Sequence, residues 1–502
     1  MTVEPGFDAF EQAYRDGRPH VLTLRLVDDL ETPISAYLKL GRGKRYAFLY
    51  ESVEGGAWRG RYSIITLNPD LVWRCRGDKA EIARGFDPVA ADAFEPETAG
   101  ALDSLRALLA ESAIDFPSTL PPMAAGLFGV LGYDMVRLVE PLGAPNPDPL
   151  DLPDAIMVRP SIVAVFDSIG QEIVLATPVR PEGVEARVAY DTALARLEAV
   201  HEQLREPLPL PGETRPRSQA PFKPAHTLES YSDIVARAKE YIAAGDIFQV
   251  VPSQRFEAPF ELDPFAFYRS LRRTNPSPFL FYLNFGNYQL AGSSPEILVR
   301  LRDGEITIRP IAGTRRRGAT PDEDLALEQD LLADPKELAE HLMLLDLGRN
   351  DVGRTALPAS VKVTQSFAVE RYSHVMHIVS NVTGKAPPDA DPVEVLLAAL
   401  PAGTVSGAPK VRAMEIIDEL ETVKRGLGYA GAAGYISAKG EVDTCIVLRA
   451  ALFKDGRIYA QAGGGVVADS DPRAEYEETL HKSGAARRAA EEAWRFDRGE
   501  NR

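Results

Sequence analysis

The chain has 502 residues, of which 45% are hydrophobic and 26% are charged, a composition typical of a globular protein with about three domains. Its 56 lysines and arginines against 73 aspartates and glutamates give a net charge of −17. This charge argues against a protein that coats nucleic acid, because phosphate contacts require clustered cations, but it leaves room for an anionic small molecule in a locally positive pocket.

Strands and helices mix along the chain without regular alternation. β-rich runs predict strands at 162–166, 247–256, 279–285, 306–308 and 458–462. Apolar spacing predicts helices at 231–244, which ends at Gly245, at 322–348, and at 475–496, which follows the capping pair Asp471-Pro472. Because the pattern is not a strict strand–helix–strand repeat, the sequence predicts the α+β class.

A proline-rich segment, residues 206–226, divides the chain. It holds six prolines, which stiffen the backbone and remove amide donors, as in a linker. It separates an N-terminal region, 1–205, from a C-terminal region, 227–495, in which we expect the catalytic chemistry.

The two cysteines, Cys75 and Cys445, are too few for a disulfide framework or a cysteine-based zinc site, and they suit a reducing compartment. The first ten residues are acidic and lack the apolar stretch of a secretory signal. The longest run with few charges, 123–132, is too short to cross a bilayer. We therefore expect a cytoplasmic protein without a membrane partner.

Two carboxylate pairs stand three residues apart on predicted helices: Glu337 with Glu340, and Glu475 with Glu478. Like charges at this spacing each cost a few tenths of a kcal/mol, roughly, and a hard cation with oxygen ligands would offset that cost. The spacing is also compatible with an ordinary solvated helix face. If the two helices face one cleft, they suit Mg²⁺.

Long motifs in the C-terminal region resemble those of the chorismate-binding enzymes. They are PIAGT at 310–314, EHLMLLDLGRND at 340–351, GTVSGAPK at 403–410 and QAGGGV at 461–466. The third is not a phosphate-binding loop, because its glycines are too close together and Pro409 precedes the lysine. The N-terminal region resembles the branch of large subunits of anthranilate synthase, at FLYESVEGG (48–56), GRYS (60–63) and GLFGVLGY (126–133).

The resemblance implies a fold and a reaction. The fold is a four-layer α/β/β/α core with orthogonally packed antiparallel sheets, into which the N-terminal region is woven. The reaction adds ammonia to chorismate and then eliminates pyruvate, which gives anthranilate for tryptophan biosynthesis. Mg²⁺ is expected on Glu340 and Glu478, with Glu337 and Glu475 around it.

The resemblance also implies substrate contacts and catalytic groups. Arg449 and the amides of Gly463, Gly464 and Gly465 would bind the enolpyruvyl carboxylate, since an arginine fork pairs with a carboxylate in two places. The remaining substrate contacts are Gly313, Thr314 and Tyr429. Glu296 matches the general acid that protonates the leaving hydroxyl, His377 matches a histidine linked to pyruvate elimination, and Thr404 is a weaker candidate. For Lys482 we favour a solvated helix residue.

Two positions discriminate between reactions within the family. Gln249 stands where isochorismate-forming relatives have a lysine that activates water, a base that neutral ammonia does not need. Ala312 stands where many aminodeoxychorismate synthases have a lysine that attacks the ring. Its absence disfavours the p-aminobenzoate branch, which remains the alternative, together with an inactive tryptophan-sensing homologue.

Regulation and a partner subunit are further implications of the resemblance. Glu51 and Ser52, with Pro278, Phe279 and Leu280, match the segments that form a tryptophan inhibitor site. Tyr50 and the Phe279-Leu280 pair depart from the usual residues there, which implies an altered affinity. Neither cysteine lies in the setting of a glutaminase nucleophile, so ammonia from glutamine must come from a separate amidotransferase subunit.

Overall fold

Two long antiparallel strands, β4 (Tyr62–Arg76) and β8 (Ala155–Asp167), form the centre of the sheet structure. The computed structural model describes residues 3–27, 30–52, 60–85, 93–208, 220–372 and 375–497. One end of β4 pairs with β5 (Lys79–Arg84), which pairs with β6 (Glu95–Gly100). One end of β8 pairs with β9 (Glu172–Val179), and the sheet then runs through β2 (His20–Val27) to β1 (Val3–Glu4).

Two antiparallel arms extend from this pair. The first arm starts from β4 and runs through β3 (Phe48–Glu51), β13 (Phe279–Asn284), β14 (Tyr288–Ser294), β23 (Ala450–Lys454), β24 (Arg457–Gly463), β12 (Ser253–Pro259) and β10 (Lys223–Pro224). The second starts from β8 and runs through β7 (Gly126–Leu131), β21 (Ala432–Ser437), β22 (Val442–Ile446), β15 (Ile297–Arg302), β16 (Glu305–Ile308) and β19 (Val375–Lys385), which also pairs with β17 (Ile311–Arg316) and β18 (Lys362–Arg371). A separate small ladder joins β11 (Gln249–Val250) to β20 (Gly407–Ala408).

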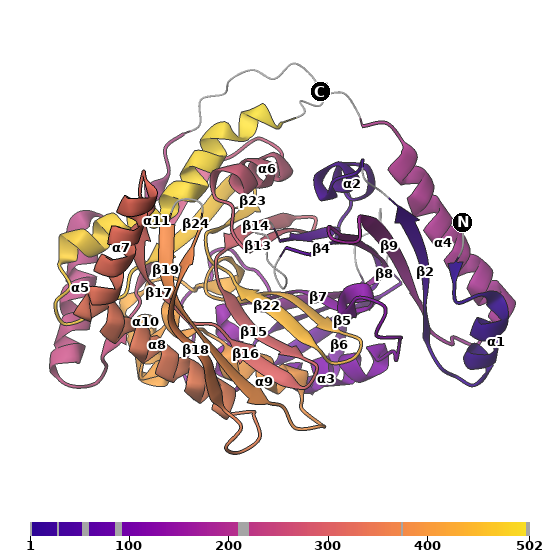
Figure 1. The fold of residues 1–502 in the computed structure, drawn as a ribbon, viewed down its shortest axis with the longest axis horizontal. Coiled ribbons are helices and arrows are strands. Elements are labelled where there is room, and N and C mark those ends of the chain that lie inside the picture. Colours follow the sequence, from indigo (N-terminus) through magenta and orange to yellow (C-terminus); the bar gives the residue numbers. More distant parts are fainter. Residues whose placement is uncertain are drawn as a thin grey trace.

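Helices cover the outer faces of both arms, as Figure 1 shows. The α-helices are α1 (Phe7–Arg15), α2 (Pro33–Leu40), α3 (Ala101–Ser112), α4 (Ala186–Arg205), α5 (Leu228–Ala243), α6 (Pro264–Thr274), α7 (Pro321–Ala333), α8 (Pro335–Gly353), α9 (Pro392–Ala399), α10 (Lys410–Leu420) and α11 (Pro472–Glu492). The short 3-10 turns are η1 (Pro122–Ala124), η2 (Tyr133–Leu138), η3 (Gly403–Val405), η4 (Gly426–Gly428) and η5 (Ala493–Arg495). Among the residues described, no helix is both long and apolar enough to cross a membrane.

Three layers of buried apolar side chains hold this arrangement together. One layer lies between the first arm and α2, α6 and α11 and continues between α4 and strands β2 and β9, and another lies between the second arm and α3, α8 and α9. The third lies between the arms, where Phe281 and Leu452 of the first arm meet Phe128 and Ala433 of the second. The predicted α+β class, with two sheet layers between two helix layers, is confirmed.

Strands from before and after the proline-rich segment pair directly with each other. In the first arm Glu51 of β3 is opposite Leu280 of β13, and in the second arm Leu131 of β7 is opposite Ala432 of β21. Within the proline-rich segment, residues 209–219 lie outside the described residues, and Lys223–Pro224 already pairs with β12.

The helix predicted for 322–348 is wrong in one respect, because the chain forms two helices there, α7 and α8. The break falls at Asp334-Pro335. Asp334 accepts hydrogen bonds from the backbone N–H groups of Lys336 and Glu337, and Pro335 takes the first position of α8. This is the usual signal for a helix start, and it outweighs the continuous leucine spacing.

Candidate active site

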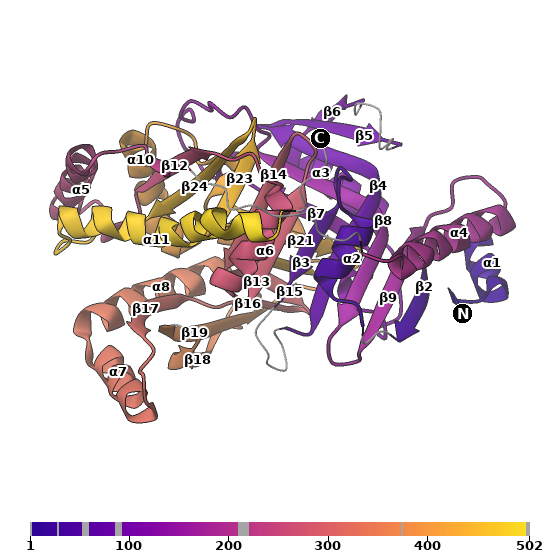
Figure 2. The same cartoon turned by 90° about the horizontal axis from the view of Figure 1, so that it is seen from above.

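Two capped helices bring the four predicted carboxylates together. Figure 2 shows α8 and α11 in the half of the molecule that lies away from α1 and α4. The pKa of Glu340 is raised by burial and then by the neighbouring charges of Glu337 and Glu478, and the pKa of Glu475 is raised by burial and by Glu478. The four acidic groups therefore face one region.

This acidic region fits a hard cation. Oε2 of the buried Glu475 has no hydrogen-bond partner among the described residues, and only Arg315, at 3.4 Å from Glu337, and Lys482, at 2.7 Å from Glu478, form salt bridges with the other carboxylates. No three His, Cys, Asp or Glu side chains in the described ranges are grouped so as to enclose a metal ion. A magnesium ion here would need water and substrate oxygens as further ligands, as Mg²⁺ commonly does.

The glycine run at the end of β24 lets backbone approach these side chains. A Cβ on Gly464 would lie 2.7 Å from Oε2 of Glu475, and a Cβ on Gly465 would lie 2.1 Å from Nε2 of Gln249. A Cβ on Gly463 would lie 3.0 Å from the hydroxyl of Tyr429. A side chain on Gly463 would also meet the backbone carbonyl oxygen of Pro252 at 2.5 Å, and one on Gly464 or Gly465 would displace Glu475 or Gln249, so the run joins the carboxylates to Gln249 and Tyr429.

Lys482 is an exposed residue of α11, as predicted, but it also contacts the site. Its side chain is 45% exposed, but Nζ lies 2.7 Å from Glu478 and donates a hydrogen bond of 3.0 Å to the carbonyl oxygen of Gly463. One turn of α11 therefore places a cation between the carboxylate cluster and the glycine run, which i,i+4 spacing allows.

Glu296 lies between β14 and β15 as a buried acid. Burial raises its pKa to about 8, and Thr404, the backbone of Ile311 and the charge of Arg449 only partly offset this rise. Glu296 and Thr404 line one cavity of about 20 Å³. The Thr404 hydroxyl has no hydrogen bond of normal geometry within the described residues. Glu296 therefore carries a proton at neutral pH and can act as a general acid.

Arg449 is the cation whose charge acts on this acid. It lies between β22 and β23 with a positive φ of 46° and is half-buried. Its guanidinium has no hydrogen bond or salt bridge with any residue in the described part of the chain. Burial lowers the pKa of Arg449, and the charge of Glu296 partly offsets this lowering. A half-buried guanidinium without a partner is suited to bind a carboxylate in two places.

Neighbouring strands hold the remaining predicted groups. His377 of β19 is opposite Thr314 of β17, next to a bulge at Gly313, whose φ is 64°. His377 Nδ1 lies 2.9 Å from the carbonyl oxygen of Gly313 and 3.1 Å from Oγ1 of Thr314, and burial lowers the histidine pKa. A Cβ on Gly313 would lie 3.2 Å from Oε2 of Glu337, so this strand pair borders the carboxylate cluster.

Gln249 is buried on β11, and its Oε1 is unpartnered within the described residues. All the predicted catalytic, substrate and metal residues are therefore linked by contacts or by direct electrostatic interaction. A larger cavity of about 790 Å³, lined in part by Arg106 of α3 and Pro392 of α9, contains none of them.

The five residues predicted for an inhibitor site line a separate cavity of about 460 Å³: Glu51, Ser52, Pro278, Phe279 and Leu280. The Glu51 carboxylate is already bound, at 2.5 Å to the Tyr268 hydroxyl and 3.0 Å to Nε of Arg272. Sequence reasoning missed other lining residues, such as Arg300, Tyr435 and Cys445, because they come from strands far away along the chain and no local pattern marks them.

Comparisons with known proteins identify the family. A family model for chorismate binding enzymes matches residues 64–488. The chain is 56% identical to anthranilate synthase component 1 of Cereibacter sphaeroides over 496 residues, which cover 98% of both chains, and 48% identical to that of Pseudomonas aeruginosa over 477 residues, which cover 93% of this chain and 94% of the other.

A solved structure supports the same grouping. The crystal structure of anthranilate synthase component I from Streptococcus pneumoniae superimposes with a TM-score of 0.76 at 38% identity, covering 92% of this chain and 98% of that one. The chain belongs to the chorismate-binding enzyme family, in the group of its anthranilate synthase component 1 members.

Proposed function

We propose that this chain is the chorismate-aminating subunit of an anthranilate synthase. Ammonia attacks C2 of the chorismate ring while the C4 hydroxyl leaves as water, and the enolpyruvyl group then leaves as pyruvate. Chorismate and ammonia thus give anthranilate, pyruvate and water, at the first step of tryptophan biosynthesis. The observation that supports this most is the buried Glu296, whose pKa burial raises to about 8, within electrostatic reach of the Arg449 guanidinium, which has no side-chain partner among the described residues.

Glu296 donates its proton to the leaving C4 hydroxyl. A carboxyl group with a pKa of about 8 holds that proton at neutral pH, and burial keeps bulk water from competing with the substrate as its acceptor. Thr404 orients the carboxyl group across their shared cavity. Arg449 and the amides of Gly463–Gly465 bind the enolpyruvyl carboxylate, and Tyr429, beside Gly463, packs along the substrate.

His377 serves the second half of the reaction. Its imidazole is neutral because burial lowers its pKa, and Gly313 and Thr314 fix the ring. A neutral imidazole can take the ring proton whose loss makes the product aromatic and expels pyruvate.

Mg²⁺ would be held by Glu340 and Glu478, with Glu337 and the buried Glu475 around them. When bound, it would supply positive charge for the ring carboxylate of chorismate. The clustered carboxylates, with one buried oxygen that has no hydrogen-bond partner in the described part of the chain, fit this hard cation.

The nitrogen source is free ammonia or a partner subunit that hydrolyses glutamine. Both cysteines are buried, and burial raises the pKa of the Cys75 thiol to about 12 and that of Cys445 well above its ordinary value. A thiol of this kind is a poor nucleophile. We therefore propose a separate amidotransferase subunit as partner, and the cytoplasm as the location.

We further propose that L-tryptophan inhibits the enzyme from the 460 Å³ cavity at Ser52 and Phe279. The cavity has mixed apolar and charged walls, as an amino acid with an indole ring requires. Its β21 wall begins three residues after Tyr429, so the effector and the substrate contact one continuous segment.

Anthranilate formation by the purified chain tests the proposal. With chorismate, Mg²⁺ and an ammonium salt at alkaline pH, we expect anthranilate fluorescence and equimolar pyruvate. With glutamine as the only nitrogen donor, we expect no turnover until a small amidotransferase subunit is added. Accumulation of an aminated product without pyruvate would instead indicate the p-aminobenzoate branch, and inertness to chorismate would indicate a non-catalytic homologue.

A further inference from the structure

A buried ion pair lies behind the active site and has no role in the reaction above. Arg425 is 3% exposed and Glu421 is 6% exposed. Nη2 of Arg425 lies 2.5 Å from Oε1 of Glu421, and Nε lies 3.0 Å from Oε2. Burying two charges costs free energy that their mutual attraction often fails to recover, so apolar side chains would stabilise the fold as well or better.

The rest of the guanidinium binds backbone that carries candidate catalytic residues. Nη1 donates a hydrogen bond of 2.7 Å to the carbonyl oxygen of Val405, which follows Thr404 in η3. Nη2 donates another of 2.7 Å to the carbonyl oxygen of Val251, two residues after Gln249. One rigid fork therefore fixes the Thr404 turn relative to the Gln249 strand, which a lysine could not do.

The same guanidinium packs over a candidate substrate contact. Its central carbon lies 5.3 Å from the ring centroid of Tyr429 and 4.8 Å from that of Tyr133. Both distances are within the range of a cation–π contact. The Tyr429 ring, which sits against Gly463, is thus positioned from behind by Arg425.

Glu421 extends the connection to the glycine run. Its Oε1 accepts hydrogen bonds of 2.8 Å from both the backbone N–H and the hydroxyl of Ser253. The Ser253 hydroxyl in turn accepts one of 2.8 Å from Nε2 of Gln461, two residues before Gly463 on β24. The ion pair therefore reaches the backbone beside Thr404, Gln249 and the glycine run through one or two hydrogen bonds each, and it reaches Tyr429 through the ring contact.

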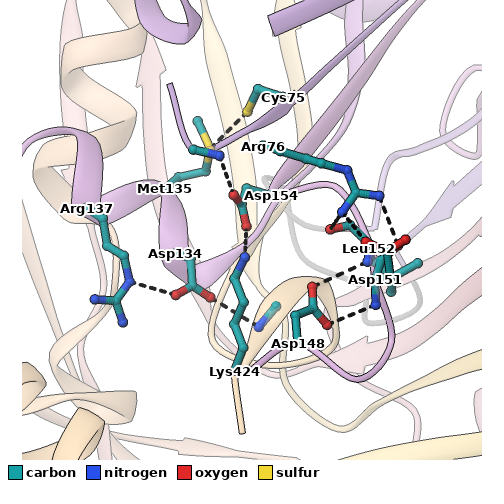
Figure 3. Close-up of polar contacts among 12 residues, drawn as sticks. Cys75, Arg76, Asp134, Met135, Arg137, Asp148, Asp151, Leu152, Asp154 and Lys424 are labelled. Carbon is teal, nitrogen blue, oxygen red and sulfur yellow. Dashed lines mark hydrogen bonds and ion pairs between the residues drawn. The ribbon is translucent and has the colours of Figure 1, made fainter. Parts of the chain in front are cut away.

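The turn that carries Arg425 is itself held by the N-terminal region. Figure 3 shows Lys424 reaching the carboxylate of Asp154, while Asp134 accepts a hydrogen bond of 3.3 Å from the N–H of Gly426 and is paired with Arg137 at 2.8 Å. The residues on both sides of Arg425 are thus anchored to the β7–β8 connection, which fixes the backbone position from which the Arg425 side chain extends.

We propose that Arg425, oriented by Glu421, is a positioning residue for the chorismate reaction: it holds the Thr404 turn, the Gln249 strand and the Tyr429 ring in register without touching the substrate. The proposal rests on the proposed function only in taking chorismate as the substrate. It predicts that changing the pair lowers kcat more than it changes KM, because Arg449, which belongs to none of these hydrogen-bond chains, stays in place to bind the carboxylate.

The first test is Arg425→Lys, which keeps the buried charge but cannot bridge three acceptors. The readout is ammonia-dependent chorismate consumption, with the products identified separately. We expect kcat to fall by about tenfold to a hundredfold, the range that small misplacements cost, with KM for chorismate changed by less than about threefold. Arg159→Lys is the matched control, since Arg159 is equally buried on β8 and pairs with Asp70 and Glu111 at 2.8 Å. It should keep wild-type kcat.

The double variant Glu421→Leu/Arg425→Met separates positioning from stability. Removing both charges together leaves no unpaired buried ion, so the thermal midpoint should stay near that of Arg159→Lys while kcat remains low. A folded Arg425→Lys or double variant with kcat within twofold of wild type overturns the proposal. Loss of folding in both variants also overturns it, because the pair is then structural for the whole chain. If wild type consumes chorismate but forms another product, the proposed function fails and this comparison still stands.

Discussion

Thr314 and His377 stand opposite each other on neighbouring strands, with Oγ1 and Nδ1 3.1 Å apart. Nδ1 also lies 2.9 Å from the carbonyl oxygen of Gly313. A carbonyl oxygen can only accept, so Nδ1 carries the hydrogen and Nε2 keeps its lone pair. Nε2 makes no hydrogen bond with another described residue, which leaves it as a proton acceptor.

His377→Ala should therefore damage the second half of the reaction more than the first. We expect pyruvate release to fall by about a hundredfold or more, while chorismate consumption falls less and an aminated intermediate accumulates. A coupled pyruvate assay beside chromatography of the ring compounds measures both. Thr314→Val, which keeps the Gly313 carbonyl as acceptor, should show a milder effect. Equal loss of both activities in His377→Ala would contradict this division of roles.

Glu296→Gln should abolish turnover, because an amide cannot donate the required proton. We expect kcat to fall by about a hundredfold or more. In wild type, the rate at fixed free ammonia should be constant from neutral pH to about pH 8, where His377 is neutral, and fall above it, as Glu296 loses its proton at a pKa of about 8. Stopped assays at constant free ammonia give this profile. An unchanged rate up to pH 10 would assign the acid elsewhere.

The same substitution should change how stability depends on pH. Burial raises the pKa of Glu296 from 4.5 to about 8, so the folded chain binds a proton that the unfolded chain has lost between these values. The stability that this carboxyl contributes is full below pH 4.5 and is lost as pH rises to 8, by about 1.4 kcal/mol per pH unit. Glu296→Gln should thus gain stability relative to wild type between pH 5 and 8, as denaturant unfolding would measure. A constant difference would contradict the raised pKa.

Glu340→Gln tests the metal assignment. Loss of one carboxylate from the cluster should remove Mg²⁺-dependent turnover and leave the thermal midpoint unchanged or higher, because burial and two neighbouring charges already disfavour the ionised form. Calorimetric titration with Mg²⁺ measures binding directly. Asp346→Asn, an exposed carboxylate on the same helix, should behave like wild type. Full activity of wild type in excess chelator would contradict a role for the metal.

Ser52→Phe and Glu51→Gln separate inhibition from stability. Ser52 lines the 460 Å³ cavity, so a phenyl group there should raise the tryptophan concentration for half-inhibition by about tenfold or more and leave ammonia-dependent activity intact. The Glu51 carboxylate pairs with Tyr268 and Arg272, so Glu51→Gln should also lower the thermal midpoint. Tryptophan inhibition curves and thermal melting curves of both variants measure these two effects. Unchanged inhibition in Ser52→Phe would move the effector site elsewhere.

The sequence carries the parts of the site that are local. The helix cap at Asp471, the apolar spacing of 322–348 and the glutamates three residues apart predict that Glu340 and Glu478 lie on helices. Apolar spacing does not reveal the break at Asp334-Pro335, because the leucine pattern continues through it. Resemblance, rather than spacing, assigned roles to Glu296 and Arg449.

Contacts between distant strands are what the sequence does not reveal. Arg425 and Glu421 are four apart on an ordinary-looking charged stretch, and only the fold brings Val405, Val251 and Ser253 to them. Lys482 is an exposed lysine, and its contact with the Gly463 carbonyl arises only because α11 packs beside β24. Such groups acquire their partners from tertiary packing, which no local pattern encodes.

The pairing of β3 with β13 and of β7 with β21 has a consequence for anyone who cuts the chain. A fragment beginning at residue 227 would expose the edges of β13 and β21, both apolar, and would be prone to aggregate. The fragment 1–205 would lack the strands that cover β3 and β7. Co-expressed, the two pieces should instead complement each other as a split enzyme, whose reassembly could be followed by the return of activity.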